Sequence, residues 1–294
     1  MSSPVLFPKA RVSLEYFPPK SISAERALMT AAHALARFKP AYQTVTFGAG
    51  GSDVSDSLDW PSRLQNLNEV PTAAHLSLSR FQGRDAVLSH ADHLWQRGVR
   101  RLVVIRGDGD GVLVGFQSVA HAVRVLKGLH PFDISISAYP EVHPLAGSDA
   151  SDLDVLLAKQ EAGADWAITQ FFFDNEDFYA FRDRAERAGF YREIVPGIMP
   201  ITNFEKIARF AEQCGAAIPQ TMRERFAACG DDRENHTILA RELVSEQVAD
   251  LARNGVEAIH VYTMNRIDLA ADTIRAFQGE SDAIAQSHHL KLAS

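Results

Sequence analysis

Short apolar runs alternate with amphipathic segments along most of the chain, and this alternation predicts strands separated by helices. In the first run, Val12, Leu14 and Tyr16 alternate with other positions in the two-residue period of a strand. Pro18 and Pro19 follow, and because proline cannot donate to a strand ladder, the strand must end there. Apolar residues then recur with helical spacing, and the same pair of patterns returns to the end of the chain.

The individual elements can be placed from these runs. The strands are expected near Val12 to Phe17, Tyr42 to Phe47, Ala73 to Leu78, Arg101 to Ile105, Ile134 to Ala138, Trp166 to Phe171, Glu193 to Ile198 and Ala258 to Tyr262. The helices are expected near Ser21 to Phe38, Leu58 to Leu67, Val87 to Gly98, Phe116 to Leu126, Asp149 to Ala162, Asp177 to Ala188, Phe204 to Glu212, Thr221 to Ala228, Glu234 to Arg253 and Arg266 to Phe277.

This order of elements predicts a closed (β/α)8 barrel, the TIM barrel. Eight strand–helix units in 294 residues favour the barrel over an open doubly wound sheet. The stretch from Asn203 to Asn254 holds more helix than one crossover needs, so extra helices are expected before the last strand. No linker rich in proline, glycine or serine is seen, and residues 1–294 are therefore expected to form one domain.

Composition and charge exclude some classes of partner. The chain is 46% hydrophobic and 23% charged with no long apolar run, which indicates a globular protein outside the membrane. A net charge of −7 disfavours nucleic acid and anionic membranes as partners. Cys214 and Cys229 lack metal-ligand or CxxC spacing and indicate a reducing compartment. Residues 1–10 lack the features of a signal peptide, so a cytoplasmic location is expected.

Polar side chains collect where the predicted strands end. In a barrel the carboxyl ends of all strands meet at one mouth, where active sites lie. The residues concerned are Glu15, Thr46, His75, Arg106, Asp108, Tyr139, Glu141, His143, Gln170, Met199 and Tyr262. Core packing requires none of these polar groups, so the set favours a functional site. Taken singly, Glu15 can be an ion-pair partner, and His75 or His143 a structural histidine.

Missing motifs narrow the chemistry at this mouth. The glycines near Gly48 and Gly107 lack the G-x-G-x-x-G spacing of a Rossmann site, and no P-loop is present. No predicted strand ends in lysine, which disfavours a Schiff-base aldolase. Glu15, His75, Glu141 and His143 form an improbable metal set, so no metal is expected. Carboxylates, an arginine and flat side chains suit a planar cofactor that brings its own chemistry.

Seven stretches of the sequence resemble one known family. They are Leu14-Glu-Tyr-Phe-Pro-Pro19, Thr44-Val-Thr-Phe-Gly-Ala-Gly50, Ile105-Arg-Gly-Asp108, Ala138-Tyr-Pro-Glu-Val-His-Pro144, Ala162-Gly-Ala164 with Ile168-Thr-Gln-Phe-Phe-Phe-Asp174, Pro196-Gly-Ile198 and His260-Val-Tyr-Thr-Met-Asn-Arg266. In this order they resemble the 5,10-methylenetetrahydrofolate reductases, specifically the short bacterial form. The resemblance implies a barrel that binds FAD non-covalently and has no regulatory domain. It also implies a homo-oligomer.

The resemblance implies a ping-pong reaction in one-carbon metabolism and methionine synthesis. NADH or NADPH reduces FAD and leaves, and 5,10-methylenetetrahydrofolate then accepts the hydride to give 5-methyltetrahydrofolate. Glu15 matches the general acid that protonates folate N10, and its apolar neighbours are expected to raise its pKa. Asp108 matches the catalytic aspartate beside the flavin, whose charge stabilises a cationic folate intermediate. Which of the two nicotinamide cofactors is preferred does not follow from the sequence.

The resemblance also assigns binding residues. For FAD they are Thr46, His75, Arg106, Gly107, Asp108, Tyr139, His143, Asp152 and Lys159. For folate or nicotinamide they are Glu15, Gln170, Phe210, Tyr262 and Arg266. Lys159, His143 and Arg106 are the local cations that a pyrophosphate needs on an acidic chain.

Three departures from the family pattern leave other functions open. Val155 replaces an asparagine directed to the cofactor, Lys206 replaces a glutamine near the substrate, and the loop from Gly107 to Phe116 is short and acidic at Asp110. The alternatives are another FAD-dependent barrel resembling proline dehydrogenase, a flavin-free barrel that passes hydride directly, and a non-catalytic folate- or flavin-binding barrel.

Overall fold

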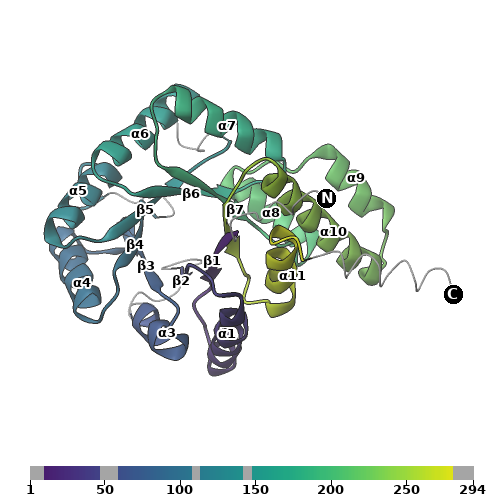
Figure 1. Cartoon of the computed structure of the whole chain (residues 1–294), viewed down its shortest axis with the longest axis horizontal. Helices are drawn as coiled ribbons and strands as arrows, with labels where there is room; N and C mark the ends of the chain where they lie inside the picture. Colours follow the sequence, from purple (N-terminus) through teal and green to yellow (C-terminus); the bar gives the residue numbers. More distant parts are fainter. Residues whose placement is uncertain (1–9, 47–58, 108–112, 142–147, 281–294) are drawn as a thin grey trace, which may run out of the picture.

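A computed structural model of the chain describes residues 10–46, 59–107, 113–141 and 148–280. Eight parallel strands close into a barrel in sequence order, with the helices outside the ring (Figure 1). The strands are β1 (Arg11–Tyr16), β2 (Tyr42–Val45), β3 (Thr72–Ser77), β4 (Arg101–Ile105), β5 (Asp133–Ala138), β6 (Trp166–Phe171), β7 (Glu193–Ile198) and β8 (Ala258–Tyr262). The predicted (β/α)8 barrel is confirmed.

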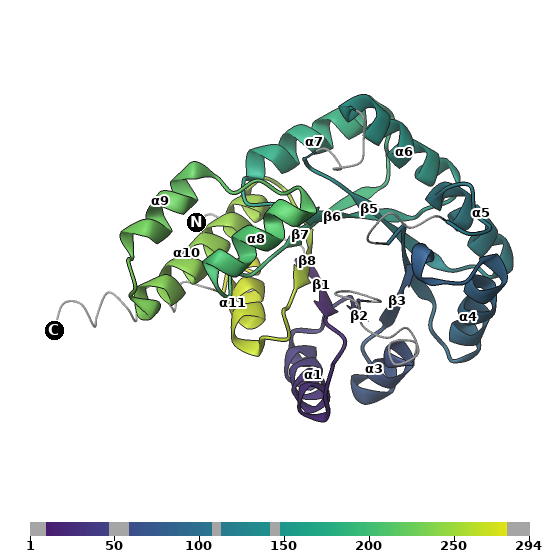
Figure 2. The same cartoon turned by 180° about the vertical axis from the view of Figure 1, so that it is seen from behind.

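The helices follow the strands as the apolar periodicity predicts. Their bounds are α1 (Ile22–Leu35), η1 (Ala36–Phe38), α3 (Trp60–Asn68), η3 (Leu78–Arg80), α4 (Arg84–Gln96), α5 (Val119–Leu129), α6 (Asp149–Glu161), α7 (Asn175–Arg187), α8 (Phe204–Cys214), α9 (Gln220–Ala228), α10 (Arg233–Arg253) and α11 (Ile267–Phe277). The expected extra helices are α8, α9 and α10, between β7 and β8, and Figure 2 shows them extending to one side of the ring.

Side-chain caps move two helix starts away from the predicted positions. Ser118 accepts a hydrogen bond from the backbone N–H of His121, so α5 begins at Val119 and not near Phe116. Asp174 accepts one from the N–H of Glu176, so α7 begins two residues before the predicted Asp177. In both cases the cap satisfies a backbone donor that the first helical turn leaves free.

Aromatic and aliphatic side chains fill the barrel interior at the amino-terminal ends of the strands. Tyr42 meets Trp166 edge-on with ring centroids 4.9 Å apart, and Val103 and Ile168 pack with them. The guanidinium carbon of Arg101, the first residue of β4, lies 5.4 Å from the centroid of the Tyr42 ring. Side chains therefore fill the barrel interior at the amino-terminal ends of the strands, and Glu15 lies toward the carboxyl end of β1.

Candidate active site

Glu15 lies inside the barrel on β1, with only 6% of its surface exposed. Its Oε2 atom is 3.1 Å from Nε2 of His260 on β8 and 3.1 Å from Nε2 of His75 on β3. The loop after β8 fixes this end of β1, because the N–H and hydroxyl of Thr263 both donate to the Glu15 carbonyl, at 2.9 and 2.7 Å. Asn265 donates to and accepts from the backbone of Phe17. The carboxylate is therefore held rigidly between two imidazoles.

The expectation that the Glu15 pKa is raised is wrong for this arrangement. Burial alone does raise the pKa, as the apolar neighbours suggested. Attraction to His75 and the hydrogen bond with His260 act in the opposite direction and outweigh burial, which lowers the pKa to about 2. The sequence around Glu15 contains neither histidine, so the local pattern gave no sign of this effect.

His260 was not assigned a role from the sequence, although it is the most completely buried member of the group. Its ring is 0% exposed, and its Nδ1 atom lies 2.8 Å from the Ser13 hydroxyl. The Tyr42 hydroxyl lies 3.4 Å from the same nitrogen. Ser13 lies two residues before Glu15 on β1, so the two side chains are on the same face of the strand.

His75 has unsatisfied polar atoms inside the barrel. It is 6% exposed, and neither ring nitrogen has a well-directed hydrogen bond among the described residues. Its approach to Glu15 is an ion-pair contact. A buried donor or acceptor without a partner is costly, so such a group is a candidate for binding a ligand.

The predicted substrate residues lie around the same mouth. The Tyr262 hydroxyl donates to the Thr169 carbonyl at 2.9 Å, and its ring meets that of His260 edge-on. Burial raises the pKa of Tyr262, and the nearby Glu15 charge adds to this rise. Gln170, the next residue along β6, accepts a hydrogen bond from the Phe171 N–H.

Two further predicted substrate residues come from the helices. Phe210 on α8 is 37% exposed and stacks on Phe171 with centroids 5.5 Å apart. Lys206 lies exposed one turn earlier on the same helix. Arg266 precedes α11 and makes an ion pair with Asp268 at 3.1 Å, which gives it a structural partner.

The predicted FAD residues are only partly described. Thr46 donates to the Tyr16 carbonyl at 3.1 Å, and Tyr139 and Arg106 are partly exposed at their strand ends. Gly107 has a φ of +97°, and a Cβ there would collide with the hydroxyls of Ser77 and Ser79. Asp108, Asp110 and His143 lie outside the described residues.

Lys159 on α6 is buried, at 6% exposed, and its ammonium donates to the Ser137 carbonyl at 3.0 Å. Burial lowers its pKa to about 8, and the charge of Asp152 partly opposes that change. Asp152, Val155 and Lys159 recur at helical spacing on one face of α6. Val155 is 51% exposed there, an apolar side chain beside the two charged ones.

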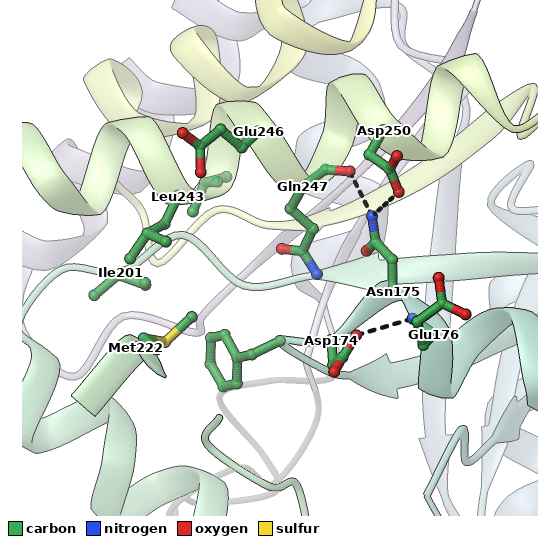
Figure 3. A pocket seen from close by; sticks show the side chains of 11 residues that line it. Asp174, Asn175, Glu176, Ile201, Met222, Leu243, Glu246, Gln247 and Asp250 are labelled. Atoms are coloured by element: carbon green, nitrogen blue, oxygen red, sulfur yellow. Dashed lines mark hydrogen bonds between the residues drawn. The ribbon is translucent and has the colours of Figure 1, made fainter. Parts of the chain in front are cut away.

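A cavity of about 290 Å³ lies away from these residues (Figure 3). Its lining comes from the start of α7 and from Ile201, α9 and α10, and includes none of the predicted site residues. The amide of Asn175 donates to the Gln247 carbonyl and to Asp250, so these polar groups already bond with one another. The cluster at Glu15 is the stronger candidate for the active site.

No helix among the described residues is long and apolar enough to cross a membrane. Within the same residues, no group of three or more histidine, cysteine or acidic side chains has the arrangement of a metal site.

Comparison with known families gives a match over nearly the whole chain. Residues 7–277 match the family model described as methylenetetrahydrofolate reductase. A 5,10-methylenetetrahydrofolate reductase from Escherichia coli (strain K12) is 36% identical over 262 residues, which are 88% of each chain. The enzyme of the same name from Pectobacterium carotovorum is 36% identical over 267 residues, 89% of this chain and 88% of the relative.

More distant proteins share parts of this likeness. An Arabidopsis thaliana methylenetetrahydrofolate reductase (NADH) is 30% identical over 86% of this chain but only 46% of its own length. An uncharacterized Clostridium thermocellum protein that binds two copies of 5-methyl-5,6,7,8-tetrahydrofolic acid superposes with a TM-score of 0.63 at 13% identity, covering 92% of this chain and 95% of that one. A 2,3-dimethylmalate lyase structure gives 0.52 at 12% identity, covering 91% and 78%. These two structures show a shared fold.

Proposed function

We propose that this chain, which belongs to the methylenetetrahydrofolate reductase family, reduces 5,10-methylenetetrahydrofolate to 5-methyltetrahydrofolate with FAD as cofactor and NADH or NADPH as reductant. Reduction of methylenetetrahydrofolate is the activity named for the family. The cofactor, the nicotinamide reductant and the ping-pong order are the proposed additions.

The observation that carries the proposal is the buried Glu15 carboxylate between two imidazoles at the mouth of the barrel. The folate C–N bond at N10 breaks readily only when the nitrogen is protonated, because an unprotonated amine is a poor leaving group. The carboxylate and the two imidazoles in contact with it form a group inside the barrel that can supply this proton. A barrel that only binds folate has no need of one.

The described residues fit an FAD molecule at this mouth. The Nδ1 atom of His75 has no hydrogen-bond partner among the described residues and can bond with FAD. The backbone at Gly107 packs so closely against Ser77 and Ser79 that only glycine fits there. Lys159 supplies a buried cation for the pyrophosphate. When bound, FAD supplies the hydride chemistry, and these residues hold and orient it. Asp108 and His143 remain predicted contacts from the resemblance.

The predicted substrate residues form a surface on which two flat rings, nicotinamide and the folate pterin, can bind in turn. Phe210 presents a partly exposed aromatic face stacked on Phe171, and Tyr262 is fixed beside it through Thr169. We propose that nicotinamide and the folate pterin use this surface in turn, with Gln170 hydrogen-bonding the pterin. One shared surface requires the first product to leave before the second substrate enters, which is ping-pong order.

An absorbance spectrum of the purified protein, followed by anaerobic NADH and then methylenetetrahydrofolate, tests the proposal. We expect a flavin band that bleaches with NADH and returns with the folate. Bleaching without recovery would indicate a flavin reductase with another acceptor. A protein with no flavin band even after addition of FAD would contradict the FAD assignment and favour a flavin-free or binding-only barrel.

Lys159→Met is expected to weaken FAD binding by on the order of 10- to 100-fold, because a buried charge-assisted hydrogen bond is lost.

The affinity of the wild-type protein for FAD should also depend on pH. FAD binds the protonated amine, whose pKa is lowered to about 8, so affinity is highest below that pH and falls by up to about tenfold per pH unit above it. Fluorescence titration of the apoprotein with FAD measures both effects.

Lys159→Met is also the control for the pH dependence of FAD binding to the wild-type protein. Binding to Lys159→Met should be flat between about pH 7 and 9, since no amine titrates there in the FAD site. An equal pH dependence in both proteins would remove Lys159 from the pyrophosphate site.

A further inference from the structure

The proposed function gives no role to Glu141, although this residue is one of the polar side chains at the strand ends. It lies three positions after the end of β5 and two positions after Tyr139, a predicted FAD residue. Its Oε1 atom accepts a hydrogen bond of 2.7 Å from the backbone N–H of Ala217, in the connection between α8 and α9. Because β6 lies between β5 and β7 in the barrel, this bond joins the end of β5 to the inserted helices across a neighbouring strand.

The end of α8 leaves this amide available to a partner outside the helix. Gly215 adopts a left-handed conformation with φ 75°, and the N–H groups of Gly215 and Ala216 both bond back to the last turn of α8. Ala217 supplies the next N–H along the chain, and Pro219, which precedes α9, has none to donate. Glu141 therefore fixes the chain at the point where the bonds of the helix end.

The surroundings of Glu141 are unfavourable for a second purpose, that of a free surface charge. Burial raises the pKa of Glu141, and the charges of Asp177 and Asp174 at the start of α7 raise it further. The hydrogen bond from Ala217 acts in the opposite direction and lowers the pKa. Since the two aspartates repel a carboxylate at this position, the bond to Ala217 has to offset that repulsion.

The helix held by this bond carries the proposed ring-binding surface. Phe210 lies about one turn before the end of α8 and stacks on Phe171, the last residue of β6, with ring centroids 5.5 Å apart. Ile207 and Ala211 bury the same helix in the core. Apolar packing is non-directional, whereas a hydrogen bond prefers one geometry. Glu141 therefore restricts rotation and sliding of α8, and with it the position of the Phe210 ring.

We propose that Glu141 is a positioning residue that holds the connection after α8 against the end of β5 and thereby fixes Phe210 in the orientation that both flat rings require. This inference rests on the proposed function, in which nicotinamide and the pterin bind the same surface in turn. Glu141 touches neither ring and transfers neither hydride nor proton. Its loss should therefore weaken binding of both rings by a similar factor and leave the rates of the bound complexes nearly unchanged.

Glu141→Ala removes the acceptor. We expect the half-saturating concentrations of NADH and of methylenetetrahydrofolate each to rise by about five- to tenfold, while both limiting rates stay within about threefold and FAD affinity within about twofold. Glu141→Gln keeps an oxygen that can accept the Ala217 N–H and carries no charge for the aspartates to repel. This conservative variant should stay within about twofold of the wild-type protein.

Glu242→Ala is the matched control. Glu242 on α10 forms an exposed ion pair with Arg225 on α9 at 3.7 Å, so it joins two of the inserted helices to each other and not to β5. A surface ion pair of this kind contributes little to stability, and the control should leave both half-saturating concentrations within about twofold.

Anaerobic rapid mixing at a series of NADH and folate concentrations gives the half-saturating concentration and the limiting rate of each half-reaction. Unchanged half-saturating concentrations in Glu141→Ala would overturn the proposal, as would a change confined to one of the two substrates. A fall in FAD affinity as large as the fall in NADH affinity would also overturn it, because Glu141 would then act on the cofactor. Equal defects in Glu141→Gln and Glu141→Ala would exclude the hydrogen bond to Ala217 as the cause.

Hydrogen–deuterium exchange of the whole FAD-loaded protein tests the same contact without turnover. We expect peptides covering residues 204–219 to exchange at least about threefold faster in Glu141→Ala than in the wild-type protein or Glu141→Gln, and peptides from α4 to be unchanged. Equal exchange of residues 204–219 in all three proteins would overturn the proposal. If the wild-type protein reduces no folate while exchange in α8 depends on Glu141 as expected, the proposed function fails and the role of Glu141 in holding α8 stands.

Discussion

Glu15→Gln is expected to lower folate-dependent reoxidation of the flavin by on the order of 10²- to 10⁴-fold, while NADH still reduces the flavin at nearly the wild-type rate. The amide matches the shape of the carboxyl group and keeps contact with His260, but it cannot transfer a proton. Reduction of flavin by NADH passes a hydride and requires no proton on a substrate nitrogen. The two half-reactions should therefore respond very differently to one substitution.

Anaerobic stopped-flow absorbance at the flavin band measures each half-reaction separately. Glu193→Gln is the matched control, because Glu193 forms a partly exposed ion pair with Arg11 at the opposite end of the barrel. The control should leave both rates within about twofold, as expected for a surface ion pair. Wild-type folate turnover in Glu15→Gln would remove Glu15 from the acid role.

Gly197→Ala is expected to destabilise the fold by about 1–3 kcal/mol and to lower folate turnover further than that loss explains. A Cβ at Gly197 would collide with the Thr169 carbonyl and would lie 2.7 Å from Cε2 of Tyr262. The Thr169 carbonyl is backbone and accepts the Tyr262 hydroxyl, so relief of the collision must move the tyrosine. Tyr262, one of the proposed folate-binding residues, is then no longer held in place.

Urea denaturation and the apparent Michaelis constant for folate measure these two effects. Gly128→Ala is the control, because a Cβ at this position in α5 meets nothing within 4 Å. It should leave turnover unchanged and leave stability equal or higher by about 0.5–1 kcal/mol, since alanine suits a helix better than glycine. A Gly197→Ala protein as stable and active as the control would contradict this prediction, because Tyr262 would then move without loss of stability or activity.

The strands could be predicted from the sequence because apolar runs, proline and glycine mark them locally. Arg101–Ile105, Trp166–Phe171, Glu193–Ile198 and Ala258–Tyr262 have the predicted bounds. Helix starts were harder to place, since a cap such as Ser118 or Asp174 acts through a single hydrogen bond. The predicted helix from Ser21 to Phe38 divides into α1 and η1, and Lys39 then adopts a left-handed conformation with φ 50°.

The site was predictable as a set of strand-end residues but not as a network. Glu15 and His75 stood out as polar groups at the ends of apolar strands. His260 lies within the apolar run of β8, and periodicity does not distinguish a side chain facing the barrel interior from one facing the helices when both sides are buried. The effect of the two histidines on Glu15 depends on contacts between distant strands, which one sequence does not display.

The pairing of β1 with β8 has a consequence for the folding of the protein. Glu15 and His260 are separated by 245 positions, and they meet only when the last strand closes against the first. Contacts of such long range form late in folding, because a very long loop must first be closed. A nascent chain that still lacks β8 cannot form the Glu15–His260 contact. The recovery of proton transfer during refolding would therefore report closure of the ring itself.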